Sequence, residues 1–179
     1  DAVAAYFGRY RMNYNLVKRT NWKDLLAAYD SGACIALTGE VTQLAAARRT
    51  LTAPAQHTIL PEVVSKEPLG PAVRAQDSNW FAIVRWVRMA LVVAEELGVD
   101  STNVSAMSTS AFDDVRRLMG TDSSLGQSLG LDAEWARRMI AAVGNYGEMY
   151  ERNLGSRSDL KLERGYNKLW MHGGLMYGV

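Results

Sequence analysis

The first third of the chain alternates between helix-like and strand-like patterns of apolar side chains. Apolar positions three or four residues apart predict helices at residues 1–10, 22–30 and 44–51, the second capped by Asn21 and ended by Ser31-Gly32. Short apolar runs of strand length stand between and after these helices, at residues 14–18, 33–38 and 57–60. Alternation of this kind favours an α/β layer with parallel strands.

From residue 77 onward the pattern is almost wholly helical. An apolar stripe that starts at a cap, Asp77 or Ser78, and runs to Gly98 predicts a long helix. Asp132 is expected to cap a second long helix, and Gly120 is expected to end a shorter one. Apart from the first long helix, the helices predicted in this part lie at residues 111–119, 133–153 and 162–171.

The two parts meet at residues 68–71, which read Pro-Leu-Gly-Pro. Pro68 and Pro71 each bias the residue before them toward extended geometry, and Gly70 can adopt conformations that other residues resist. This unit therefore predicts a junction that turns the chain and cannot be helical. Residues 70–75 are a further candidate strand.

Length and composition indicate a folded protein without a basic binding surface. The chain of 179 residues is 48% hydrophobic, which is ample for a core, and a chain of this length usually forms one domain. It has 20 Lys and Arg residues against 19 Asp and Glu residues and no run of like charge, so no nucleic-acid partner is expected. No uncharged apolar run approaches the roughly 18 residues that a transmembrane helix needs, so no transmembrane segment is expected. The start at DAVAAYFGRY, without Met, is expected to be the interior of a longer protein.

Residues that could carry chemistry are few, and none forms a recognisable site by itself. His57 and His172 have no His, Cys or carboxylate at the spacing of a metal site, so no metal is expected. Cys34, the single cysteine, lies in an apolar run where an inert thiol is expected, and it cannot form an internal disulfide. Gly144 and Gly147 fall within a predicted helix rather than in a phosphate-binding turn. No catalytic residue, enzymatic activity or cofactor is therefore predicted.

Four of the tryptophans stand at helical spacing among other apolar residues, at positions 80, 86, 135 and 170. Large aromatic rings dominate both protein cores and protein interfaces. We interpret these four first as core residues, and a partner-binding surface is the second interpretation.

The chain resembles a known family over residues 60–99 and 130–178, which read LPEVVSKEPLGPAVRAQDSNWFAIVRWVRMALVVAEELGV and GLDAEWARRMIAAVGNYGEMYERNLGSRSDLKLERGYNKLWMHGGLMYG. These long consecutive runs are similar to the C-terminal half of general L-amino-acid-binding proteins, the periplasmic receptors of polar amino-acid ABC importers. That family has two α/β lobes that clamp an amino acid in the cleft between them. The resemblance implies an α/β, incomplete periplasmic binding protein-like fold and a periplasmic location.

The resemblance also implies a division of the chain. Residues 1–69 would be a partial second lobe with parallel strands, residues 70–76 the hinge return strand, and residues 77–179 the mainly helical C-terminal part of the first lobe. Pro68, Gly70 and Pro71 would then form the hinge. The first half of the family's chain, including the sheet of the first lobe, is missing from this sequence.

One binding residue follows from the resemblance, in the segment SGACIALTGEVTQL. The family has an Asp near the end of this strand that holds the α-ammonium group of the ligand, and Glu40, preceded by Gly39, stands in its place. Glu keeps the charge but extends the carboxylate by one methylene, which displaces a charge-assisted hydrogen bond by about one ångström or more. Ile35 stands where relatives often carry an acidic residue, and the usual partner of Cys34 lies in the missing part, so this thiol is expected to be free.

Two functions follow as hypotheses. The first is a truncated, non-catalytic accessory or structural component of a periplasmic or membrane-associated complex, in which other protein subunits cover the surface left by the missing lobe. The alternative is the solute-binding component of an ABC importer for polar L-amino acids, in which lobe closure around an L-amino acid signals a permease.

Overall fold

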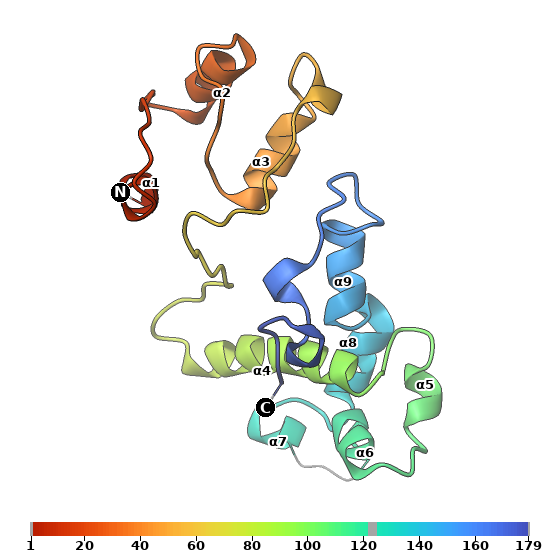
Figure 1. The fold of residues 1–179 in the computed structure, drawn as a ribbon. Helices are drawn as coiled ribbons and strands as arrows, with labels where there is room; N and C mark the ends of the chain where they lie inside the picture. Colours follow the sequence, from red (N-terminus) through yellow and green to blue (C-terminus); the bar gives the residue numbers. More distant parts are fainter. Residues whose placement is uncertain (1, 122–124, 179) are drawn as a thin grey trace. The chain divides into compact units, whose positions relative to one another are not determined.

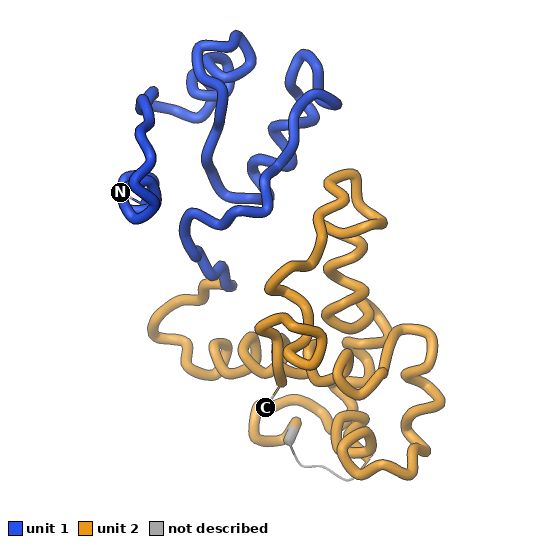
Figure 2. The backbone as a smooth tube through the Cα atoms, in the orientation of Figure 1, with its two compact units in different colours: residues 1–70 blue, residues 71–179 orange. Residues whose placement is uncertain are grey.

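The computed structural model describes residues 2–121 and 125–178. The chain divides into two compact units, residues 1–70 and 71–179, which Figure 2 colours separately. The boundary falls between Gly70 and Pro71, within the predicted junction. Around it, residues 65–74 have no helix or strand, and Pro68, Gly70 and Pro71 are exposed. Gly70 does not adopt a positive φ, so the conformational freedom expected of this glycine is not used.

The first unit contains three short helices, labelled in Figure 1: α1 (Ala2–Arg9), α2 (Trp22–Asp30) and α3 (Val41–Arg48), followed by the 3₁₀ turn η1 (Pro54–Gln56). Asn21 caps α2 as predicted, because its side chain accepts a hydrogen bond from the backbone N–H of Asp24 at 2.9 Å. The helix α3 begins three residues earlier than predicted, since Glu40 caps it. The buried side chains of this unit are small apart from one: Ala28, Ala45, Ala47 and Leu51.

The parallel strands expected in the first unit are not confirmed. Residues 14–18, 33–38 and 57–60 have no regular secondary structure, and neither do residues 70–73. A strand exists only where a neighbour accepts and donates its backbone hydrogen bonds, and within residues 2–121 and 125–178 the one isolated bridge joins Leu169 to Met176. Ile35, in the middle of an expected strand, is 99% exposed.

The second unit is helical. Asp77 caps α4 (Ser78–Glu96) by accepting from the backbone N–H of Trp80 at 2.9 Å. The other helices are α5 (Val104–Met107), α6 (Asp113–Met119), α7 (Leu125–Ser128), α8 (Trp135–Val143) and α9 (Tyr146–Asn153). Gly120 ends α6 as predicted, and it does so in the left-handed conformation, with a φ of 80°. None of the helices in the described residues has the length and apolar character to cross a membrane.

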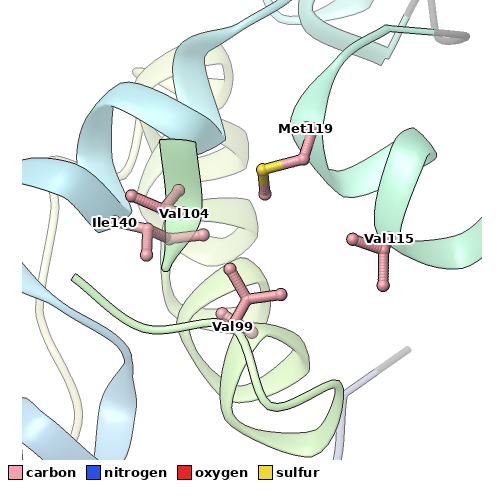
Figure 3. Packing of buried hydrophobic residues seen from close by; sticks show 6 residues of the cluster. Val99, Val104, Val115, Met119 and Ile140 are labelled. Atoms are coloured by element: carbon pink, nitrogen blue, oxygen red, sulfur yellow. The ribbon is translucent and has the colours of Figure 1, made fainter. Parts of the chain in front are cut away.

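A compact apolar cluster holds α4, α5, α6 and α8 together. Figure 3 shows Val104, Val115, Met119 and Ile140 pointing toward one another and toward Val99, which follows α4. Met119, Ile140 and Val99 are completely buried. Ala94 of α4 completes the cluster.

Two helix predictions in the second unit are wrong. The long helix expected at residues 133–153 is two helices, because Gly144 has a φ of 79° and ends α8, and Asn145 then caps α9. The side chains of Asn145 and Glu148 form a reciprocal capping box there. Residues 162–171 do not form a helix but two 3₁₀ turns, η2 (Gly165–Asn167) and η3 (Trp170–His172).

The interpretation of the tryptophans as core residues is wrong for three of the four. Trp80 is 52% exposed, Trp86 40% and Trp170 61%, whereas Trp135 is half-buried. The buried residues of α4 are Ala90, Leu91, Val92 and Ala94, all in its C-terminal half. The N-terminal half of α4 therefore presents large apolar side chains to the surface.

Candidate ligand-binding residues at the start of α3

Glu40 stands where the chain enters α3 and caps this helix with its own side chain. Its Oε2 accepts a hydrogen bond from the backbone N–H of Gln43 at 2.9 Å and another from the hydroxyl of Thr42. Shorter side chains such as Asp, Asn and Ser usually cap helices, so the longer Glu must fold back on the first turn to do so. The predicted binding residue is therefore held at a helix N-terminus.

The carboxylate of Glu40 is charged at neutral pH. Its half-burial alone would raise the pKa, but the hydroxyl and backbone N–H of Thr42, with the N–H groups of Gln43 and Val41, lower the pKa below its ordinary value. The partial positive charge of the helix N-terminus also favours the anion. Glu40 has no ion-pair partner within the part of the chain that the structure describes. The donors that this anion has among those residues are all neutral.

The residue before Glu40 packs tightly against α2. A Cβ atom added to Gly39 would lie 3.2 Å and 3.3 Å from two ring atoms of Trp22, and 3.5 Å from a methyl carbon of Leu44. Distances of this size leave almost no room for a side chain. Trp22 is the first residue of α2 and Leu44 belongs to α3, so the turn that contains Gly39 and Glu40 packs against both helices.

A second set of contacts fixes the loop after α3. The hydroxyl of Tyr29 and Nδ1 of His57 are 2.8 Å apart, and Asp30 accepts hydrogen bonds from the backbone N–H and the hydroxyl of Thr52 at 3.0 Å and 2.8 Å. These bonds from Thr52 lower the pKa of Asp30. His57 is thus part of a structural contact between α2 and this loop.

The second unit contains a charged cluster that joins α4, α9 and the C-terminal segment, which we define as residues 162–178. Arg164 pairs with Glu95 through both of its terminal nitrogens, and one of them also donates to the carbonyl of Asn167 at 2.7 Å. Its guanidinium lies 5.5 Å and 5.7 Å from the ring centres of Tyr146 and Tyr150. Burial raises the pKa of both tyrosines, so they are neutral. Both terminal nitrogens of Arg164 are paired, whereas its Nε is buried without a hydrogen-bond partner among the described residues. The arrangement fits a structural joint.

The other residues considered from the sequence do not come together. Cys34 is free and half-buried, and His172 is exposed on η3. Across residues 2–121 and 125–178, no three His, Cys, Asp or Glu side chains are grouped in a way that could hold a metal ion. Gly147 lies inside α9, and Gly144 lies at the break before it.

Sequence reasoning found Glu40 but missed the two residues that position it. Thr42 is visible in hindsight as a hydroxyl two residues after a helix cap, a spacing that lets it reach the capping carboxylate. Trp22 carries no such local signal, because its contact with Gly39 joins positions far apart in the sequence.

Comparisons with known proteins agree with the resemblance. No family model matches the chain. The chain is 47% identical over 177 residues to the general L-amino acid-binding periplasmic protein AapJ of Rhizobium johnstonii. It is 42% identical over 176 residues to the glutamate/glutamine/aspartate/asparagine-binding protein BztA of Rhodobacter capsulatus. Each alignment covers 98% of this chain and 52% of the relative, so the chain spans about half the length of these relatives.

A solved structure extends the agreement to the fold. An ABC transporter/periplasmic binding protein from Brucella ovis with glutathione bound matches 99% of this chain and 56% of its own, at 46% identity and a TM-score of 0.87. These relatives are named as binding proteins, which is consistent with the expectation of no enzymatic activity. By sequence and by fold, the chain corresponds to the C-terminal half of the amino-acid-binding periplasmic proteins of ABC transporters.

Proposed function

We propose that the chain is part of the periplasmic solute-binding component of an ABC importer for polar L-amino acids, and that Glu40 binds the α-ammonium group of the ligand. The observation that carries this proposal is the state of Glu40: a charged, half-buried carboxylate, fixed at a helix N-terminus, with no cation beside it in the described residues. A ligand ammonium group would supply the missing positive charge. The comparisons with amino-acid-binding periplasmic proteins support the same ligand class.

The ligand of the solved relative indicates which chemical group the site recognises. That protein holds glutathione, whereas the relatives named above are described as binding amino acids. Glutathione begins with a γ-linked glutamyl residue, so it carries a free α-ammonium and a free α-carboxylate, as an amino acid does. We therefore propose that the ligand is recognised by this α-amino acid head group, and that the site in this chain contributes the contact to its ammonium.

The junction fits a hinge in this proposal. Pro68, Gly70 and Pro71 lie in an exposed, extended segment at the boundary of the two units. The division into a second lobe at residues 1–69, a hinge return at 70–76 and a first-lobe part at 77–179 remains a prediction. In this proposal the prolines limit the hinge to extended geometry, and closure on the ligand signals the permease.

The accessory-subunit hypothesis receives less support from the comparisons than the solute-binding one. What favours a protein partner is the apolar surface of the second unit, where Phe81 and Leu175 are 56% and 66% exposed, in addition to Trp80 and Trp170. Large exposed apolar side chains of this kind are typical of protein contact surfaces when they lie together. In the solute-binding proposal the partner of this surface is the rest of the binding protein, and in the accessory hypothesis it is another subunit.

Calorimetry decides between the two functions. We expect the intact protein to bind at least one of glutamate, glutamine, aspartate, asparagine or glutathione at micromolar concentration or below. Glu40→Gln should weaken this binding at least tenfold, because the amide has no charge to pair with the ammonium. Glu62→Gln, which changes an exposed carboxylate near the junction, is the matched control and should change affinity less than twofold. Absence of binding, together with copurification in a membrane complex, would favour the accessory hypothesis.

A further inference from the structure

We infer that Thr42 is a positioning residue for the ligand: its hydroxyl fixes one oxygen of the Glu40 carboxylate and so directs the other oxygen to the ligand's ammonium group. This inference rests on the proposed function and deepens it. It assigns a role to a side chain that need not touch the ligand itself.

The two carboxylate oxygens of Glu40 differ in the hydrogen bonds that they accept. The hydroxyl of Thr42 and the backbone N–H of Gln43 both donate to the same oxygen, Oε2, while the backbone N–H groups of Val41 and Thr42 also favour the charged carboxylate. Oε2 thus carries the side-chain cap of α3, and Oε1 is the oxygen assigned to the ligand. A primary ammonium, with three N–H donors, fits a single anionic oxygen of this kind.

Thr42 also compensates for the longer side chain of Glu40 compared with the Asp that the resembled family has there. A Glu in place of the family's Asp carries its carboxylate one methylene further out, with one more rotatable bond. By holding Oε2 back over the first turn of α3, the hydroxyl of Thr42 shortens the reach of the side chain and removes that freedom. The longer residue then offers a fixed oxygen at the helix N-terminus, as a capping Asp would.

Both ends of this arrangement are rigid. Thr42 is β-branched and lies in the first turn of α3, so its own side chain has little torsional freedom. On the other side, the ring of Trp22 packs against Gly39 and fixes the backbone from which Glu40 extends. The torsions of the Glu40 side chain are the remaining freedom, and the Thr42 hydroxyl restricts them together with the backbone N–H of Gln43.

A double-mutant cycle tests whether Thr42 acts through Glu40. Thr42→Val, which keeps the shape but removes the hydroxyl, should weaken binding of the tightest amino acid about tenfold. Thr42→Ser should restore affinity to within threefold of the unsubstituted protein, since it keeps the hydroxyl. In the Glu40→Gln background, Thr42→Val should cost less than a further twofold. Thr50→Val is the matched control, because that hydroxyl donates to the carbonyl of Ala47 at the other end of α3.

Two outcomes of this cycle would overturn the inference. One is unchanged affinity in Thr42→Val. The other is an equal loss in both backgrounds, which would show that the hydroxyl acts on the fold and not through the carboxylate. Thermal unfolding of each variant accompanies the titrations, so that a loss of folded protein is not counted as a loss of affinity.

A ligand-free measurement separates this inference from the proposed function. The Glu40 carboxyl can be titrated by carbon-detected NMR in the unsubstituted protein and in Thr42→Val. We expect it to titrate at higher pH in the variant, because a hydrogen bond that favours the anion has been removed. If the protein binds no amino acid, the proposed function fails. The titration still decides whether Thr42 holds the carboxylate of Glu40: an unchanged titration overturns that contact, and a shifted one upholds it.

Discussion

The two units of the chain differ in how their apolar residues are used. In the second unit, side chains from four helices and the loop after α4 meet in one cluster, and its largest members are fully buried. In the first unit, the buried residues are mostly alanines, and Ile35, in an expected strand, is almost completely exposed. Helices satisfy their own backbone hydrogen bonds, whereas strands depend on neighbours. The helical unit therefore has an apolar core of its own, whereas the unit whose pattern calls for a sheet buries few large side chains.

The largest effect expected from this comparison is in the core of the second unit. Ile140→Ala should lower the free energy of unfolding of that unit by about 4 kcal/mol, because Ile140 is completely buried among α4, α5 and α6. Leu51→Ala in the first unit should cost only about 2 kcal/mol, since the other buried side chains of that unit are alanines and offer little packing to lose. Hydrogen exchange read by mass spectrometry reports the two units separately. Equal losses of unfolding free energy in Ile140→Ala and Leu51→Ala would contradict this difference between the two units.

The same contrast explains what the sequence could and could not predict. The caps Asn21 and Asp77 and the stop at Gly120 were predictable because each acts within a few residues of itself. The expected strands, by contrast, depend on partners outside their own segments. The single long helix predicted at residues 133–153 failed for a local reason: Gly144 and Asn145 favour a break, and the apolar periodicity concealed it.

The candidate site divides in the same way. Glu40 was found through the resemblance, because its charge and place in the sequence carry the information. The packing of Trp22 on Gly39 depends on how two helices meet, which no pattern along the chain records. The charged joint between Glu95 and Arg164 was missed for the same reason.

A second prediction concerns that joint. Arg164→Gln leaves Glu95 without its cation in a site where both side chains are about 15% exposed, and should cost about 2 kcal/mol of unfolding free energy. Arg138→Gln removes a pair with Asp132 in which both side chains are about half exposed, and should cost much less, because solvent screens an exposed pair. Urea unfolding at neutral pH measures both. A cost for Arg164→Gln as small as that of the control would show that the joint does not stabilise the second unit.

A third prediction uses pH to sharpen the contrast between local and distant contacts. Glu148 completes the capping box of α9 by accepting from the backbone N–H of Asn145, and it also accepts hydrogen bonds from the backbone N–H and hydroxyl of Ser101, at 3.0 Å and 2.5 Å. Burial alone would raise its pKa, but the bonds from Ser101 and Asn145 lower it in the folded protein. Its contribution is therefore complete above the pKa of the unfolded chain and is lost as pH falls through the lower folded value.

Glu148→Gln should remove that pH dependence. At neutral pH it should cost about 1 kcal/mol, the size of a lost helix cap. As pH falls through the lowered folded-state pKa, the variant and the unsubstituted protein should approach one another, since below it the carboxylate is protonated in both states. Unfolding measured between pH 3 and 7 tests this, and a difference that stays constant over the whole range would contradict it.

The smallest effect is expected in the first unit, at the close contact between the ring of Trp22 and Gly39. Gly39→Ala places a methyl group 3.2 Å from the indole ring, so the ring or the turn must give way by a few tenths of an ångström. We expect a loss of about 0.5 kcal/mol in stability. The loss in the free energy of ligand binding should be larger than this loss in the free energy of unfolding, because the shift moves the backbone that carries Glu40. Gly8→Ala in α1 is the matched control, since an added Cβ there meets nothing within 4 Å. A Gly39→Ala protein that binds ligand as tightly as the Gly8→Ala protein would show that Trp22 supports the turn without placing the carboxylate.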